Sequence, residues 1–337
     1  MKKMLSLIFG AALTVTSVVP SFAATDKSFS TVGSSGVFIN EDFTKPEAEM
    51  NNDQWAPKGW SFQGVTDIEI ERVNPEGYVE LKQNFGLASA QIQYPITKAI
   101  PKNFTLMYDV YFGEDDGRYV YIPCVVNGYN LGMNASGSTS YVDAEGVNKG
   151  LSTGVPEFNT WYTYVFQVTG NRMSIYRRAE NEDSFSKVAD NVQMQTTTSA
   201  NTIRIYATNT QRRNCEARFD NVKIVSGTYL MDSEIVINPE KTEIEGKLKI
   251  GNGDIPLDKT RNLTVIMSAY DSRGKIQKLM MNPLCEVAFG EENEISVKMT
   301  IDEDVYETLK GGTVELYVWD SASGAKPQCD MHVIEVQ

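Results

Sequence analysis

Short runs in which apolar and polar residues alternate recur along the chain from about residue 37 onwards. Period-two alternation predicts β-strands, because successive side chains of a strand point to opposite faces of its sheet. The turn sequences NPEG, GEDDG, NGYN and TGN separate many of the runs. The pattern therefore predicts an all-β protein. The runs of the first part cover residues 37–43, 67–73, 78–83, 104–112, 119–126, 161–168, 172–178, 202–208 and 218–225.

The second part continues in the same style without repeating the sequence of the first. About seven strands are expected there, which matches the size of an immunoglobulin-like sandwich. The segment SGTYLMDS at 226–233 interrupts the alternation and predicts the domain boundary, giving domains at 30–227 and 228–337. Residues 301–310 predict a short helical turn. The predicted strands are 234–239, 242–250, 262–271, 275–281, 294–300, 312–320 and the terminal segment containing His332.

The N-terminus predicts export from the cell. Two lysines are followed by an apolar run from Met4 to Val19 and then by Ser21-Phe22-Ala23, which has the layout of a signal peptide at residues 1–23. No later stretch is long and apolar enough to span a membrane. We therefore expect a secreted, extracellular or surface-associated protein without membrane insertion.

Charge and residue usage exclude several functions. The net charge of −13 becomes −15 once the two signal lysines are removed, so nucleic acid is not an expected partner. His332 is the only histidine, which rules out a three-histidine metal site. The four cysteines lack zinc-site spacing and divide two and two between the predicted domains. One disulfide per domain and buried free thiols are both compatible with Cys124, Cys215, Cys285 and Cys329.

Three carboxylates alternate along the stretch VTDIEIERV: Asp67, Glu69 and Glu71. Residues at i, i+2 and i+4 share one face of a strand, and a carboxylate pair flanking a sugar bond is the apparatus of a retaining glycosidase. An ordinary hairpin explains the same residues, since a turn at 74–77 would place Glu69 opposite Lys82 and Ile70 beside Leu81. The non-catalytic interpretation is preferred, and the catalytic one is kept as the alternative.

Several segments resemble known families. INEDF with a following GW, FTLMYDVYFG, NTWYTYVFQVTGNRMSIYRR and RFDNVKIVSG together resemble a concanavalin A-like lectin/glucanase (laminin G-like) jelly roll. In the glucanases of that fold the strand motif is E-x-D-x-E, whereas the first two acids are exchanged here. SAYDSRGKIQKL and ELYVWDSASGAKPQ resemble an Ig-like module of secreted clostridial-type proteins, which implies no catalytic role and places Tyr270 and Trp319 in the sandwich core.

Glycan binding is the function that the jelly-roll resemblance implies, and it calls for aromatic faces beside hydrogen-bonding groups. Trp60 is expected in the core, Trp161 is expected to be structural, and Ile122 and Val126 are expected to face the core. Ordinary strand placement is the alternative for the tyrosines. The candidate binding residues are Trp55, Arg118, Tyr121, Tyr129, Asn134 and Tyr141.

Calcium is the one cofactor expected. Asp42 on the first strand and Asp220 on the last strand would meet if the terminal strands are neighbours, and Ca²⁺ prefers such oxygen ligands. The expected function is thus non-catalytic binding of an extracellular polysaccharide or surface glycan. The alternatives are a carboxylate-dependent glycoside hydrolase or polysaccharide lyase, and a cell-surface adhesion or structural protein.

Overall fold

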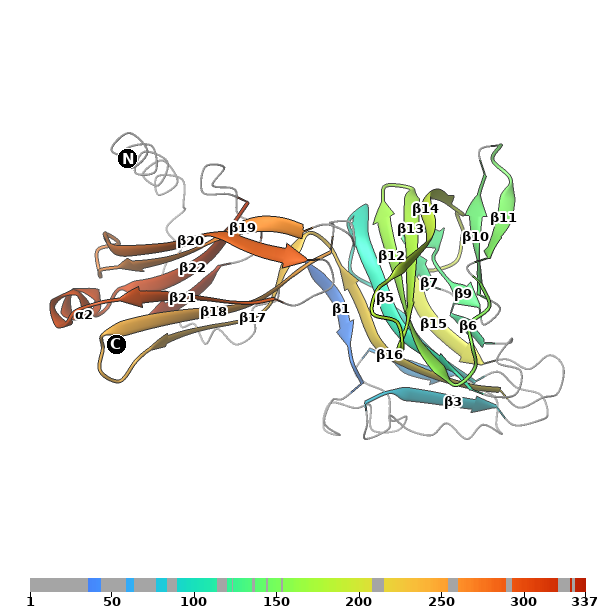
Figure 1. Cartoon of the computed structure of the whole chain (residues 1–337), viewed down its shortest axis with the longest axis horizontal. Helices are drawn as coiled ribbons and strands as arrows, with labels where there is room; N and C mark the ends of the chain where they lie inside the picture. The colour runs from blue at the N-terminus through green and yellow to red at the C-terminus, as the bar shows by residue number, and fades with distance from the viewer. Residues whose placement is uncertain are drawn as a thin grey trace. The chain divides into compact units, whose positions relative to one another are not determined.

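The computed structural model describes residues 36–43, 59–63, 77–83, 90–113, 120–122, 124–134, 137–143, 145–152, 154–207, 215–253, 260–288, 293–320, 328 and 331–337. Within these residues the chain is nearly all strand, as the alternating pattern predicts (Figure 1). The chain forms two compact units. Val37–Ser226 form the first unit, and Gly227–Gln337 lie in the second. No helix of the described part is long and apolar enough to cross a membrane.

The first unit contains a nine-stranded antiparallel sheet, whose strands come from all parts of the unit's sequence. Its order places β1 beside β16, so the first and last strands of the unit are neighbours. Along the sheet the strands are β1 (Val37–Glu41), β16 (Cys215–Val225), β5 (Asn103–Phe112), β12 (Thr160–Thr169), β13 (Arg172–Ala179), β14 (Ser186–Met194), β10 (Ser138–Val142) and β11 (Asn148–Ser152), and β3 (Val79–Gln83) also pairs with β16.

A seven-stranded sheet forms the other layer. Its strands are β2 (Ser61–Gln63), β4 (Ala90–Pro95), β15 (Thr202–Ala207), β6 (Val120–Ile122) and β9 (Met133–Asn134), with β7 (Cys124–Val126) paired to β15 and β8 (Tyr129–Asn130) paired to β7. The run predicted as one strand at 119–126 contains β6 and β7, and both pair with β15 in the same register.

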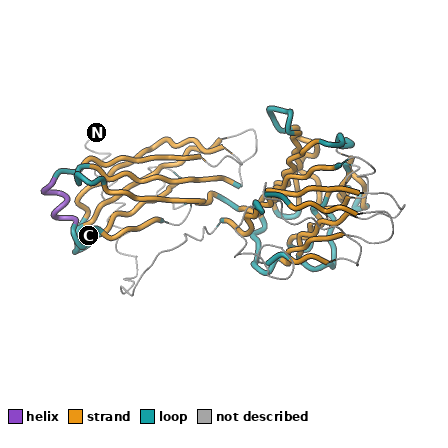
Figure 2. Tube along the Cα trace, turned by 90° about the horizontal axis from the view of Figure 1, so that it is seen from below, coloured by secondary structure: helices purple, strands orange, loops and turns teal. Residues whose placement is uncertain are grey.

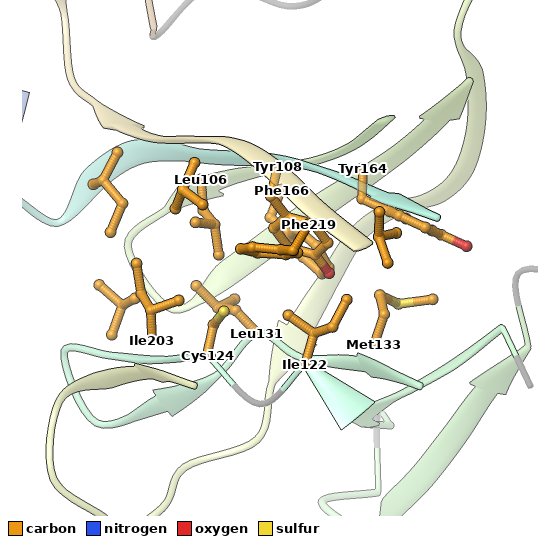
Figure 3. Close-up of a cluster of buried hydrophobic side chains, with 14 of the residues drawn as sticks. Leu106, Tyr108, Ile122, Cys124, Leu131, Met133, Tyr164, Phe166, Ile203 and Phe219 are labelled. Carbon is orange, nitrogen blue, oxygen red and sulfur yellow. The ribbon is translucent and has the colours of Figure 1, made fainter. Parts of the chain in front are cut away.

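The core of the first unit lies between the two sheets. Leu106, Tyr108, Phe166 and Phe219 of the nine-stranded sheet face Ile122, Cys124 and Ile203 of the other (Figure 3). All are nearly or fully buried, whereas Met107, Asp109 and Tyr111, which alternate with the buried residues of β5, are only partly buried. Ile122, Val126 and Trp60 are buried in this core, as expected from the sequence.

Turn chemistry fixes the register of the central hairpin. Thr169 pairs with Arg172, so β12 and β13 are joined by the two residues Gly170 and Asn171. Gly170 has φ +64°, and a glycine with positive φ at the first central position is the requirement of a type II′ turn. The TGN separator seen in the sequence is this turn.

The second unit consists of two antiparallel sheets over a separate core. One sheet contains β17 (Thr228–Ile237), β18 (Glu243–Asn252) and β21 (Asn293–Thr300), and the other contains β20 (Ile276–Ala288), β19 (Thr260–Tyr270), β22 (Thr313–Trp319) and β23 (His332–Glu335). The predicted helical turn is α2 (Glu303–Leu309), at one end of the sandwich (Figure 2). Asp302 caps it by accepting the Val305 N–H at 2.8 Å.

One expectation for the second unit is wrong. Trp319 and Tyr270 do not belong to the sandwich core. In β22 the residues Val314, Leu316 and Val318 are buried, so the alternation turns Trp319 to the opposite, half-exposed face.

Candidate functional site

A hollow of about 510 Å³ lies on the face of the nine-stranded sheet that points away from the core. Its volume falls within the range of small-ligand sites. The lining comes from the four neighbouring strands β16, β5, β12 and β13 and from the segment after β13. The lining residues are Asp109, Trp161, Thr163, Arg178, Glu180, Glu182, Asp183 and Asp220.

The register of the sheet brings these residues together. Asp220, Asp109 and Thr163 lie side by side on β16, β5 and β12, and Arg178 of β13 continues the row. A second row runs parallel to the first, two positions away on β16, β5 and β12. It consists of Arg218, Tyr111 and Trp161. The intervening residues, such as Val110, Tyr162 and Phe219, are buried in the core. Strict alternation therefore turns both rows outward.

The second row, together with Tyr78, forms an aromatic wall. The centroid of the Trp161 ring lies 5.7 Å from that of Tyr111 and 5.9 Å from that of Tyr78. The guanidinium of Arg218 lies 4.8 Å from the Tyr111 ring centroid and 5.1 Å from that of Tyr78, within cation–π range. The Tyr111 hydroxyl donates to Asn159 at 3.0 Å, which fixes the ring. We call Tyr78, Tyr111, Trp161 and Arg218 the aromatic wall.

The first row supplies a polar floor with two carboxylates on adjacent strands. Thr163 Oγ1 donates to Asp109 Oδ1 at 2.6 Å. The Asn221 side-chain amide donates to Asp109 at 2.8 Å and to Asp220 at 3.1 Å, so one nitrogen bridges the two acids. Asn221 reaches both because it sits at a β-bulge with φ +51°, where the register shifts between Asp220 and Lys223.

The carboxyl group of Asp220 is electrostatically unusual. The pKa of Asp220 is raised from 3.8 to about 7. Burial is the largest cause, the hydrogen bond from the Asn221 backbone N–H acts in the opposite direction, and the nearby acids Asp109, Asp42 and Glu41 add to the rise. Like charges on directly opposed strand positions are unfavourable. A proton, or another positive charge, is therefore favoured at this point of the floor.

The rim beyond Trp161 comes from the residues that follow β13. Glu180 accepts the Trp161 N–H at 3.3 Å, and Glu182 accepts the Ala179 N–H at 2.8 Å. Arg178 stacks on the Phe185 ring, with its guanidinium 4.6 Å from the ring centroid. The rim thus combines acceptor oxygens with one cationic donor group.

The residues that the sequence singled out for sugar binding do not line this hollow. Tyr129 and Tyr141 are partly buried and pack against the core of the first unit. Tyr121 lies on β6 and Asn134 on β9, and these two residues are direct partners in the ladder of the seven-stranded sheet. Trp55 and Arg118 lie outside the described residues, as do Asp67, Glu69 and Glu71 of the catalytic alternative and the predicted signal at 1–23.

The expected calcium ligands are neighbours, but they do not form a calcium site by themselves. Asp42 directly follows β1, beside β16, and its charge acts on Asp220. Ca²⁺ takes six to eight oxygen ligands. Both carboxylate oxygens of Asp220 already accept hydrogen bonds from Asn221. The part of the chain that the structure describes holds no group of three or more acidic, histidine or cysteine side chains placed for a metal.

Cys124 and Cys285 carry free, buried thiols. Burial raises the pKa of Cys124 to about 12. Of the two arrangements left open by the sequence, buried free thiols therefore describe these two cysteines.

Comparison with known proteins gives only distant likenesses. No family model and no curated protein matches the sequence. Among solved structures the chain is similar to a β-1,3-glucanase from Mycobacterium marinum, with 12% identity, a TM-score of 0.35, and coverage of 56% of this chain and 98% of that one. It is also similar to the carbohydrate-binding module CBM66 from Bacillus subtilis, with 15% identity, a TM-score of 0.28, and coverage of 50% and 96%.

A third similar structure is the exoplasmic/lumenal domain of VIP36 in its Ca²⁺/Man3GlcNAc-bound form, with 11% identity and a TM-score of 0.32. It covers 50% of this chain and 86% of that one. At these scores the likenesses carry no argument about function. The function has to be inferred from the hollow itself.

Proposed function

We propose that the protein binds carbohydrate in the hollow of the nine-stranded sheet. One observation supports this more than any other: an aromatic wall stands directly beside a floor and rim of hydrogen-bonding side chains. Sugar rings present apolar C–H faces and hydroxyl edges, so they need both kinds of surface at once. Trp161 offers the apolar face, while Asp109, Glu180 and Arg178 offer acceptors and a donor.

The proposed binding is non-catalytic, and it belongs to a secreted protein. Residues 1–23 would be removed on export, and the second unit would act as an Ig-like module without chemistry of its own. The partner is an extracellular polysaccharide or surface glycan. Mass spectrometry of the N-terminus of exported protein tests the secretion part, because cleavage after Ala23 gives a chain that starts at Ala24.

A glycan array with purified residues 24–337, followed by calorimetry on the glycans that bind, tests the function. Trp161→Ala is expected to weaken binding about tenfold or more, because a half-buried tryptophan at the centre of a site is a typical hot spot. Trp319→Ala is the matched control, since Trp319 is half-exposed on the second unit and outside the hollow. No glycan binding at all, or equal losses in the two variants, would refute the proposal.

A glycoside hydrolase is the second candidate, and the paired carboxylates of the floor favour it. Asp109 and Asp220 share the Asn221 amide in a hollow of substrate size, and the pKa of Asp220 is raised to about 7, as that of a general acid would be. A reducing-sugar assay on each bound polysaccharide separates the two functions. Product release that Asp220→Asn abolishes would replace non-catalytic binding with hydrolysis.

A further inference from the structure

The hollow is strongly acidic as well as aromatic. Five of its eight lining residues carry carboxylates, against a single guanidinium. That guanidinium, of Arg178, is stacked on the Phe185 ring. A polysaccharide with carboxylate or sulfate groups would meet net repulsion here, and a neutral one would gain nothing from the charge.

The two floor carboxylates are not neutralised by the described part of the protein. Asp109 accepts from the Thr163 hydroxyl and the Asn221 amide, and Asp220 accepts only from Asn221. All these donors are uncharged. No lysine or arginine among the described residues forms an ion pair with either acid. A ligand cation at this point would meet two partly desolvated carboxylates at once.

The aromatic wall is also suited to a cation. Its electron-rich ring faces already hold the Arg218 guanidinium between Tyr78 and Tyr111. An ammonium group entering beside Trp161 would therefore meet ring faces on one side and carboxylates on the other. This combination of aromatic faces and acids is how ammonium groups are recognised.

We propose that the ligand of the hollow is an amino-sugar polymer with unsubstituted, positively charged amines. This rests on the proposed function, since it specifies the glycan that the same site binds. The sugar ring stacks on Trp161, and its ammonium group lies over Asp109 and Asp220. The raised pKa of Asp220 agrees with this, because an ammonium group would take the place of the proton that the floor otherwise retains.

The test compares two β-1,4-linked hexamers of equal length, glucosamine and N-acetylglucosamine, by calorimetry at about pH 7 and moderate ionic strength, because Asp220 can ionise at that pH. The glucosamine hexamer is expected to bind about 10- to 100-fold tighter, the range given by one charge-assisted contact. Asp220→Asn should remove most of that preference. Glu157→Gln, an exposed site outside the lining that changes the net charge equally, should leave the preference intact.

Each other result has a definite meaning. Equal binding of the two hexamers, or tighter binding of the acetylated one, overturns the amine inference and leaves the carbohydrate site standing. A preference for glucosamine that falls equally in Asp220→Asn and Glu157→Gln is non-specific attraction to an acidic protein, and it also overturns the inference. If no glycan of any charge binds, both the proposed function and the amine inference are refuted.

Discussion

Replacing Asp220 by Asn should stabilise the first unit, and by an amount that depends on pH. The substitution removes a negative charge that faces Asp109 across adjacent strands and lies near Asp42 and Glu41. Asn at this position keeps an oxygen to accept the Asn221 N–H, which Asp220 accepts at 2.6 Å. The second oxygen of Asp220, which accepts from the Asn221 amide at 3.1 Å, becomes an NH2 group, so that hydrogen bond is lost while the repulsion from Asp109 is removed.

The magnitude follows from linkage between protonation and folding. Folding raises the pKa of Asp220 from 3.8 to about 7, chiefly through burial. The folded state therefore binds more protons than the unfolded state between these values, and stability falls as the pH rises through that window. At about 1.4 kcal/mol per pKa unit the full penalty is about 4 kcal/mol, and partial exposure to solvent reduces it to about 2 kcal/mol.

Denaturant unfolding followed by tryptophan fluorescence measures this effect. A Trp319→Phe background leaves only tryptophans of the first unit, so its transition is observed alone. Asp220→Asn should gain about 2 kcal/mol of unfolding free energy at about pH 8, and little at about pH 4, where the folded state binds the proton and the unfolded state partly does. The control Glu157→Gln should change stability by less than about 0.5 kcal/mol at either pH.

Two results would refute this reasoning about the floor. A loss of stability at pH 8 would show that the carboxylate of Asp220 is needed in its charged form. A gain of the same size at both pH values would show that the effect comes from packing rather than from charge.

Three further predictions concern the core, the buried thiol and calcium. Phe166→Ala should lower the unfolding free energy of the first unit by about 3–5 kcal/mol, because Phe166 is fully buried between the sheets; a loss below 1 kcal/mol would contradict the packing. Cys124 should resist a thiol reagent in the native protein and react after unfolding, as read by mass spectrometry of its peptide; native labelling would contradict its burial. Asp42→Ala should not alter any effect of Ca²⁺ on the melting temperature, because both oxygens of Asp220 already accept hydrogen bonds from Asn221; a rise with Ca²⁺ that Asp42→Ala removes would restore the calcium expectation.

Alternation was sufficient to predict most strands of the nine-stranded sheet. The runs at 104–112, 161–168 and 172–178 correspond to β5, β12 and β13, because each has one buried and one wet face. The same rule missed β14 and β11, where polar residues dominate because these strands lie toward one edge of the sheet. It also missed the start of β17, since TYLMD does not alternate cleanly around the bulge after Leu230.

The candidate site was much harder to predict, because it depends on which strands are neighbours. Asp109, Trp161, Asp220 and Tyr111 are far apart in the sequence and meet only through the pairing of β16, β5 and β12. Trp161 was expected to be structural because it begins a strand. One local signal was available: Tyr111, Trp161 and Asp109 occupy the outward positions of runs whose alternate residues are apolar. Polar and aromatic residues at such positions are natural candidates for a site.

The most direct test of the central claim is to map where a bound glycan protects the backbone. Hydrogen exchange of the protein with and without its best array glycan is expected to slow in the peptides that contain Tyr111, Trp161 and residues 180–183. Protection confined to residues 118–141, where the sequence alone placed the binding residues, would contradict the account and move the site away from the hollow.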